Sequence, residues 1–247
     1  MKQKSRFYTA RRILIFWTLF IGLGAVAGAL AMLLDPSGKS MGMDAMLSYF
    51  QVLPFADVAF QDFTFSGWAL LIVNGLTNLT AAGLLLAKKH SGVVLGGVFG
   101  VTLMLWICIQ FYMFPPNFMS TTFFFFGLAQ AATGYAAWVF EKQEAFRVDI
   151  FDYPDIGTNP ERLVVFFSRM GYGRKLAYEE ANRTGAAVYE ITATERTEGT
   201  PGFWWCGRYA LHRWDMPIEP ITAELEKYDS VTACAPIWDF SLAAPVR

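Results

Sequence analysis

A short turn rich in glycine and arginine is the part of the sequence best suited to bind an anion. Its residues are Ser168, Arg169, Met170, Gly171, Tyr172, Gly173 and Arg174. An apolar run at 163–167 precedes the turn, and helix-forming residues at 174–183 follow it. Backbone N–H groups in such a turn and at the start of the helix can donate to a phosphate. Glycine equally serves to make a tight turn without any ligand, so both interpretations remain open.

The elements that position this turn have the pattern of a small parallel sheet. The run at 163–167 is typical of a buried strand, Gly185 is placed to end the helix, and 187–191 predicts a second strand. Farther on, 221–228 predicts a helix and 231–235 a third strand, which leads into Pro236, Ile237, Trp238 and Asp239. The chain therefore contains an α/β segment with three predicted strands.

This order of motifs resembles the first half of a flavodoxin-like domain. The resemblance covers residues 162–247 and depends on LVVFFSRMGYGRKLAYEEA, a Tyr-Glu-Ile strand, LEKYDSV and APIWDFSLAAPVR. It implies that FMN is the cofactor, that residues 168–174 hold its phosphate, and that 236–239 border its ring. Met170 and Gly173 stand where the family usually has hydroxyl residues. The resemblance also implies a sheet of order 2-1-3-4-5, of which this chain would supply three strands in a truncated, partial flavodoxin-like domain.

A second helix is predicted at 202–214, and it carries Trp204, Trp205 and Trp214 together with Cys206 and His212. Two interpretations remain open for its aromatic residues. They form a core or membrane-facing surface, or they form a lid over a substrate or the edge of a flavin.

Other chemistry finds little support in the sequence. Cys108, Cys206 and Cys234 are isolated and lack metal-ligand spacing, so we expect neither a metal site nor disulfide bonds. The two histidines, His90 and His212, cannot supply a bis-histidine haem within the membrane. No basic patch suggests nucleic-acid binding. If the protein is an enzyme, a cofactor performs the chemistry.

The first part of the chain is predicted to lie in a lipid bilayer. Four apolar stretches, at 13–34, 66–87, 93–114 and 121–140, are each long enough to cross about 30 Å of hydrocarbon. None contains Asp, Glu, Lys, Arg or His. The sequence predicts a four-helix transmembrane domain at 1–141, a linker at 142–160, and a partial flavodoxin-like domain at 161–247.

Basic residues indicate the orientation, because positively charged loops stay in the cytoplasm. Those on one side are Lys2, Lys4, Arg6, Arg11, Arg12, Lys88 and Lys89. The loop at 35–65 on the other side has one lysine and four aspartates. This loop is also rich in aromatic residues, which favours a position along the membrane interface, with a ligand-binding lid as the alternative. We therefore expect a multi-pass protein of the cell membrane with both termini in the cytoplasm.

Small and polar residues recur inside the predicted spans. Glycines repeat at four-residue spacing, at Gly24 and Gly28 and again at Gly92, Gly96 and Gly100, which predicts close helix packing. Four amides also lie within the spans: Asn74, Asn78, Gln110 and Gln130. Hydrogen bonds between helices are the expected role of these amides, and a site for a quinone or another small molecule is the alternative.

Taken together, these patterns predict a membrane-anchored, FMN-dependent protein of electron transfer or reduction at the cytoplasmic face. A redox partner protein, or a second copy that completes the sheet, would be its partner besides the lipid bilayer. The alternative is a non-enzymatic membrane protein whose flavodoxin-like segment is vestigial or a docking surface. Transport is a third possibility, although the spans lack charges and show no inverted repeat.

Overall fold

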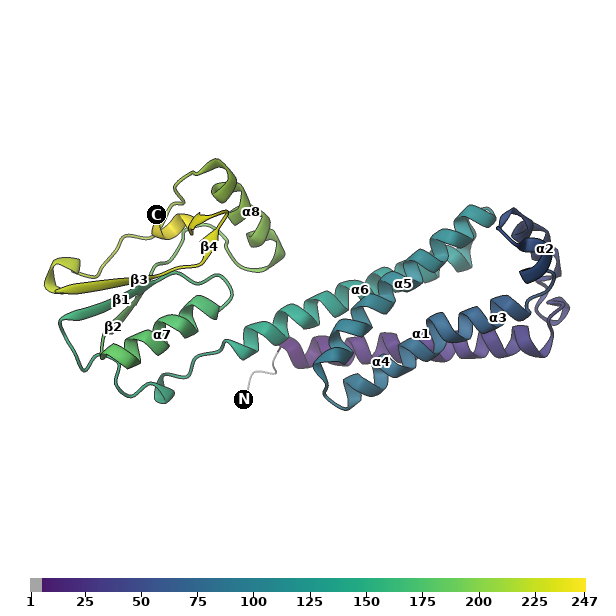
Figure 1. The fold of residues 1–247 in the computed structure, drawn as a ribbon, viewed down its shortest axis with the longest axis horizontal. Coiled ribbons are helices and arrows are strands. Elements are labelled where there is room, and N and C mark those ends of the chain that lie inside the picture. The colour runs from purple at the N-terminus through teal and green to yellow at the C-terminus, as the bar shows by residue number, and fades with distance from the viewer. Residues whose placement is uncertain (1–5) are drawn as a thin grey trace. The chain divides into compact units, whose positions relative to one another are not determined.

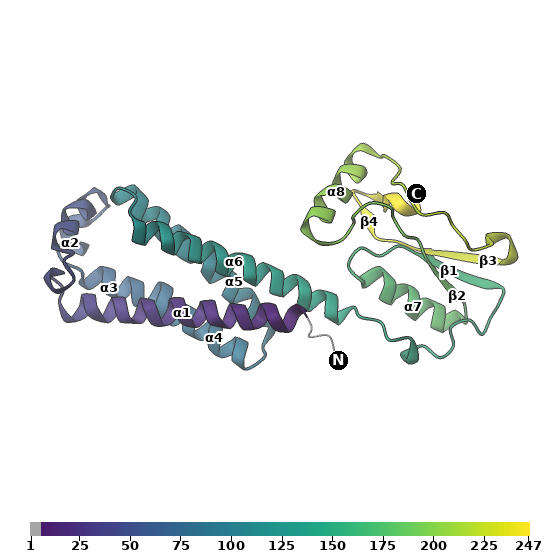
Figure 2. The same cartoon turned by 180° about the vertical axis from the view of Figure 1, so that it is seen from behind.

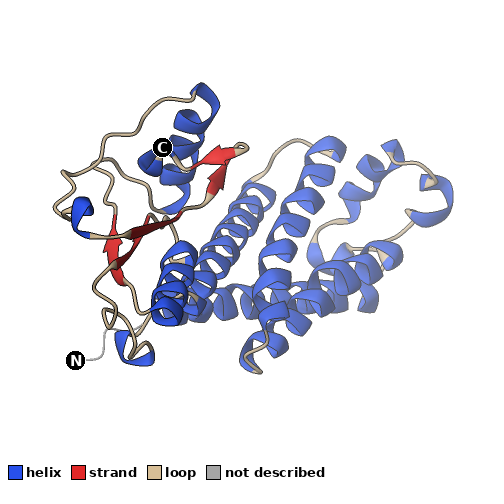
Figure 3. Cartoon of the chain, turned by 60° about the vertical axis from the view of Figure 1, so that its left-hand side comes forward, coloured by secondary structure: helices blue, strands red, loops and turns tan. Residues whose placement is uncertain are grey.

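The computed structural model describes residues 6–247, so the predicted cytoplasmic positions of Lys2 and Lys4 lie outside the described residues. The chain divides into two compact units, one that ends at Glu141 and one that begins at Lys142. Helices make up the first unit, whereas the strands among the described residues all belong to the second (Figure 3). Each unit is described by itself.

The first unit is a bundle of long apolar helices (Figure 1). Its helices are α1 (Arg6–Leu34), α3 (Thr64–Leu70), α4 (Thr77–Leu86), α5 (His90–Met113) and α6 (Phe118–Ala145). A π-helical segment, Leu71–Leu76, joins α3 to α4, so that Thr64–Leu86 is one continuous helix of 23 residues. Four helices are therefore long and apolar enough to cross a membrane, as the sequence predicts. All four begin before the predicted spans, and α6 also continues five residues beyond its span.

Glycines bring α5 and α6 into backbone contact. A Cβ on Gly134 would lie 2.3 Å from the Cα of Gly97, and a Cβ on Gly100 would lie 2.5 Å from the backbone nitrogen of Ala131. Gly92 similarly permits a close approach to Leu84 and Leu85. Close packing is thus confirmed on α5. At Gly24 the prediction is wrong, because a Cβ there would meet nothing within 4 Å.

Three of the four amides form the predicted interhelical hydrogen bonds, and Asn74 is the exception. Gln130 Nε2 on α6 donates to Asn78 Oδ1 on α4 at 2.8 Å and to the Gly96 carbonyl on α5 at 2.7 Å. Gln110 Oε1 accepts a hydrogen bond from Ser120 Oγ at 2.9 Å, which links the end of α5 to the start of α6. These bonds satisfy polar groups where water is absent, and they tie three helices together.

The segment between α1 and α3 packs against itself. It contains two 3₁₀ segments, Lys39–Met41 and Asp44–Val52, and the short helix α2 (Ala56–Ala59). The Phe63 ring is buried and contacts Phe50 edge-to-face at 5.7 Å. At its start, the Ser37 hydroxyl and the Ser40 N–H donate to the Asp35 carboxylate, which lowers the pKa of Asp35 to about 2. Its position along a membrane interface stays a prediction.

A three-stranded parallel sheet forms the centre of the second unit. Its strands are β1 (Arg162–Phe166), β2 (Ala187–Glu190) and β3 (Ser230–Cys234), in the order β2-β1-β3. Each lies within one residue of a predicted strand at both ends. The central strand is buried, as its apolar run predicts, while β3 is an edge strand among the described residues and is largely exposed.

Helix α7 (Tyr172–Thr184) covers one face of the sheet (Figure 2). Its Ala177 and Ala181 pack on Val164 and Phe166 of β1. Gly185, with φ of 72°, ends the helix as predicted, since an L side chain rarely adopts that conformation. The predicted linker at 142–160 also packs on this side, where the Asp155 N–H donates to Asn182 Oδ1 on α7 at 2.9 Å.

The opposite face is covered mainly by loop segments. The predicted helix at 221–228 is wrong, because only a 3₁₀ turn, Leu225–Lys227, forms there. The Thr222 N–H instead donates to the Tyr189 hydroxyl at 3.0 Å, which holds the segment extended against β2. An eight-residue helix has too few internal hydrogen bonds to compete with such tertiary contacts.

Two further elements lie at the carboxyl end of the sheet. Helix α8 (Gly199–His212) confirms the predicted helix at 202–214. The sequence does not predict the antiparallel hairpin of β4 (Ile237–Trp238) and β5 (Ser241–Leu242), which is followed by a 3₁₀ turn, Ala244–Val246. α8 lies beside this hairpin (Figures 1 and 2). Cys206 of α8 packs there with Met216 and Ala244.

Candidate functional site

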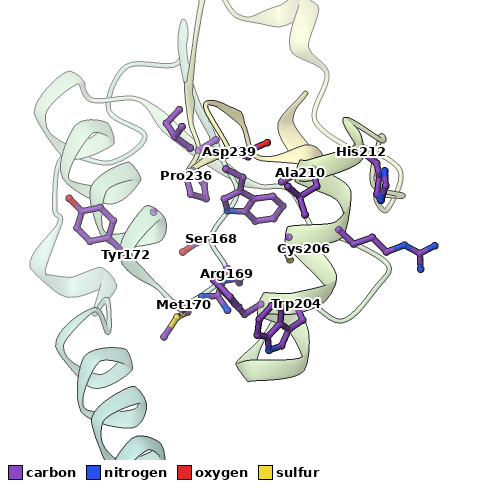
Figure 4. Close-up of a pocket in the computed structure, with 18 of the residues that line it drawn as sticks. Ser168, Arg169, Met170, Tyr172, Trp204, Cys206, Ala210, His212, Pro236 and Asp239 are labelled. Atoms are coloured by element: carbon purple, nitrogen blue, oxygen red, sulfur yellow. Dashed lines mark hydrogen bonds between the residues drawn. The ribbon is translucent and has the colours of Figure 1, made fainter. Parts of the chain in front are cut away.

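The second unit contains a cavity of about 740 Å³ at the carboxyl end of its sheet (Figure 4). Three segments line it: the turn after β1, helix α8, and the residues that follow β3. In open α/β sheets, ligands bind in the crevice outside the carboxyl ends of the strands. The volume also lies within the range of small-molecule sites, roughly 300–1,000 Å³.

The cavity brings together both segments that the sequence singles out. Nine of the eleven candidate residues line it: Ser168, Arg169, Met170, Tyr172, Gly173, Pro236, Ile237, Trp238 and Asp239. Gly171 and Arg174 are not among its lining residues. Arg174 instead forms an ion pair with Glu190 on β2, at 2.6 and 2.9 Å.

The turn after β1 leaves the start of α7 open to the cavity. Gly171 precedes the helix with φ of 100°, and no side chain caps the helix N-terminus. A Cβ on Gly173 would lie 2.9 Å from the Phe167 carbonyl oxygen, so a glycine allows the helix to begin this close to the strand. The Ser168 hydroxyl accepts a hydrogen bond from the Gly171 N–H at 3.0 Å. Backbone donors at the start of α7 can therefore face an anion.

Arg169 is the arginine of this turn that lines the cavity. Its guanidinium donates to the Gly199 carbonyl at 3.2 Å and lies 5.4 Å from the centre of the Phe203 ring. These contacts join the turn to the beginning of α8 and hold a positive charge in the wall of the cavity. Arginine is well suited to phosphate because its planar guanidinium donates two parallel hydrogen bonds.

The residues after β3 form an antiparallel hairpin rather than an open loop. Trp238 lies in β4, and its indole meets the Phe167 ring edge-to-face, with centroids 5.6 Å apart. The hairpin turn uses Asp239 and Phe240, with φ of 46° and 61°, values that are uncommon outside glycine and asparagine. The Phe240 side chain is 96% exposed.

Helix α8 supplies a third wall that the motifs alone do not reveal. Its cavity-lining residues include Phe203, Trp204, Cys206, Arg208 and His212. The run of aromatic and basic residues in this helix is the signal that points to it, and the structure is consistent with the lid interpretation for Trp204, which is 72% exposed. Trp205 and Trp214 instead enclose the Arg208 guanidinium, at 5.1 and 5.0 Å.

Titratable groups in the cavity favour binding over acid-base chemistry. Burial raises the pKa of the Cys206 thiol to about 11, so this side chain is protonated and a poor nucleophile at neutral pH. The His212 ring stacks on Trp214 with centroids 4.5 Å apart. Within residues 6–247 there is no group of three or more His, Cys, Asp or Glu that could hold a metal ion. What the cavity offers is positive charge, backbone donors and aromatic walls.

Comparisons of the chain with models of protein families, with curated proteins and with solved structures find no match. The structure by itself defines a protein with four candidate membrane spans and an α/β unit that contains a small parallel sheet.

Proposed function

We propose that the second unit binds FMN and that the protein carries out electron transfer or reduction at a membrane surface. The observation that carries this proposal is that one cavity borders both the turn after β1 and the residues after β3. The strand order β2-β1-β3 supports it, because the first three strands of the flavodoxin-like order 2-1-3-4-5 have the same arrangement.

The donors and walls of the cavity suit a phosphate joined to a flat ring. Arg169 and the uncapped start of α7 would hold the phosphate, while Trp238 and Trp204 would border the ring. Ser168 is the one serine or threonine in the turn, and its oxygen already accepts a hydrogen bond from the Gly171 N–H. Binding would therefore depend on backbone N–H groups and on arginine. When bound, FMN supplies the electron-transfer chemistry.

The α/β unit is assigned to the cytoplasmic side by the same proposal. Arg11 donates to the Leu85 carbonyl at 2.7 and 3.1 Å, which brings the basic start of α1 beside the end of α4. Lys88 and Lys89 follow α4 directly, so basic residues from two segments gather at one end of the bundle. The positive-inside rule places such an end in the cytoplasm.

Titration of FMN into the detergent-purified full chain tests the proposal. We expect a flavin absorption spectrum and quenching of FMN fluorescence with saturable binding. Arg169→Gln should weaken binding at least about tenfold, because hydrogen bonds to charged groups contribute about 1.5–3 kcal/mol. Arg174→Gln is the matched control, since Arg174 pairs with Glu190 and does not line the cavity, and it should change affinity less than twofold, or about 0.4 kcal/mol.

A docking surface is the second candidate, and exposed apolar side chains around the cavity favour it. Trp204, Leu211, Ile237 and Phe240 are each at least 67% exposed. Isolated exposed apolar residues are ordinary, but a cluster is typical of a contact surface. A protein that neither contains flavin nor takes up added FMN would favour this non-enzymatic role.

A further inference from the structure

A second cavity lies inside the helical bundle and has a different chemistry. It has a volume of about 250 Å³, and its polar lining residues are Asn74, Gln110 and Ser120. Aromatic and thioether side chains, Trp106, Phe123, Met32 and Met119, form much of the remaining wall. The lining includes no Asp, Glu, Lys, Arg or His.

Asn74 is the unusual group in this cavity. Its side chain is buried, at 1% exposure, yet neither its Nδ2 nor its Oδ1 has a hydrogen-bond partner among the described residues. Gln130 Oε1 is also without a partner, but Gln130 does not line the cavity. A buried polar group left unpaired costs about 1–3 kcal/mol, so Asn74 favours an occupant that can hydrogen-bond.

The backbone around Asn74 is also specialised. Asn74 lies in the π-helical segment Leu71–Leu76, a rare geometry that is frequent at functional sites. The Asn78 Nδ2 donates to the Asn74 carbonyl at 2.9 Å, so the backbone carbonyl is satisfied while the side chain stays free. Asn74 is ten residues into the helix that begins at Thr64. At 1.5 Å per residue, that places it about 15 Å deep, near the middle of the bilayer.

The cavity is open to a ligand dissolved in the membrane. Gly24 lines it and is exposed at the bundle surface, with nothing within 4 Å of the position of a Cβ. Another cavity of the bundle, of about 650 Å³, adjoins it and shares Met32, Trp106 and Gln110 in its wall. The smaller cavity has room for a polar ring, and the larger apolar one has room for a tail.

We propose that this intramembrane cavity binds a quinone or quinol, with the polar ring beside Asn74 and the apolar tail in the adjoining cavity. A quinone carbonyl would accept a hydrogen bond from Nδ2, and a quinol hydroxyl would donate one to Oδ1, so a single amide suits both forms. A phospholipid acyl chain would leave both atoms unpaired, and a phospholipid headgroup stays at the interface. The neutral lining excludes a charged occupant, because no counter-ion is present at this depth. The assignment is independent of FMN binding by the second unit.

Binding of a decyl-substituted benzoquinone to the delipidated, detergent-purified full chain tests the inference. Bound quinone is measured after organic extraction by the absorbance change on borohydride reduction. We expect saturable binding. Gly24→Leu should reduce affinity at least tenfold, because Gly24 lines the cavity and a leucine there would narrow its opening. Asn74→Leu should reduce it about three- to tenfold, the loss expected for one hydrogen bond.

Two variants serve as matched controls. Gly83→Leu introduces the same side chain at an exposed position that also has nothing within 4 Å, and it should leave affinity unchanged. Thr80→Val changes an exposed polar residue on the same continuous helix as Asn74 and should also be neutral. Absence of saturable binding, or equal affinity in all four variants, would overturn the assignment. Retention of phospholipid that the quinone does not displace would overturn it as well.

Discussion

Both units enclose a cavity, but the chemistry of the two linings differs. The cavity of the α/β unit has Arg169, Arg208 and Asp239 in its wall, together with the uncapped start of a helix. The cavity of the bundle has only neutral polar groups, of which Asn74 is without a partner. Charged side chains cost little free energy where water reaches them, whereas burying them in hydrocarbon costs several kcal/mol unless they are paired. The surrounding solvent therefore permits a charged lining in one unit and favours a neutral lining in the other.

Glycine also has different roles in the two units. In the bundle, Gly97, Gly100 and Gly134 remove side chains so that two helices touch. In the α/β unit, Gly171 and Gly185 have φ of 100° and 72°, and they allow the chain to turn at the ends of α7. A side chain is excluded by contact in the first case and by backbone conformation in the second.

The largest effect is expected from Gly134→Leu. Its new Cβ would meet the Gly97 backbone at 2.3 Å, and neither helix backbone can yield without separating α5 from α6. We expect a loss of about 3 kcal/mol or more, the upper end of the range for overpacking. Thermal unfolding in detergent measures it, with Gly83→Leu as the control. Equal stability of the two variants would show that the glycine contact does not hold the bundle together.

The next largest effect is expected from Asn74→Asp, which tests whether the bundle cavity must stay neutral. A carboxylate near the bilayer centre costs about 2.5–3.5 kcal/mol. Asn117→Asp is the matched control, because Asn117 is exposed and accepts from the Ser120 N–H at 2.9 Å at the start of α6, where a carboxylate is favourable. The free energies of unfolding of the two variants, measured in detergent at pH 7, should differ clearly, with Asn74→Asp the less stable. A tolerated carboxylate at Asn74 would indicate that water fills the cavity.

Much of the architecture could be predicted because it depends on local pattern. Apolar length predicts the four long helices, and the strands of the sheet follow from short apolar runs bounded by turn residues. Gly24 shows the limit of such patterns. Its four-residue spacing from Gly28 predicts packing, but whether a glycine faces a neighbour or a cavity depends on the arrangement of the other helices.

The same limit applies to the sites. The turn after β1 and the residues after β3 could be singled out. For α8 the sequence leaves the lid and the core interpretations open, because the choice depends on where the crossover between β2 and β3 places the helix. The predicted helix at 221–228 fails because the Tyr189 hydroxyl captures the Thr222 N–H. The hairpin of β4 and β5 lacks the Asn-Gly or Asp-Gly signal of its turn type and uses Asp239 and Phe240 instead.

The smallest of the effects concerns Cys206, whose titration lowers the stability of the α/β unit at alkaline pH. Burial raises the pKa of its thiol from 9.0 to about 11 in the folded protein. Below pH 9 the thiol is protonated in both states. Between pH 9 and 11 the unfolded chain loses the proton while the folded chain keeps it, so rising pH favours unfolding. This rise in pKa corresponds to about 2.8 kcal/mol in all, since one pKa unit corresponds to about 1.4 kcal/mol. About 2 kcal/mol of this is lost between pH 9 and 11, because titration extends beyond both ends of that window.

Cys206→Ala removes this contribution, so the variant should lose less stability than the wild type between pH 8.5 and about 11. Urea unfolding of the full chain in detergent, followed by tryptophan fluorescence, gives the free energy of unfolding of each protein. The titration of other groups is common to the variant and the wild type, so it cancels in the difference. Cys234→Ala is the control, because burial also raises the pKa of Cys234 but its side chain is only partly buried. Parallel pH profiles for wild type and Cys206→Ala would mean that water reaches the thiol. Water would then reach Cys206 more easily than its packing against Met216 and Ala244 indicates.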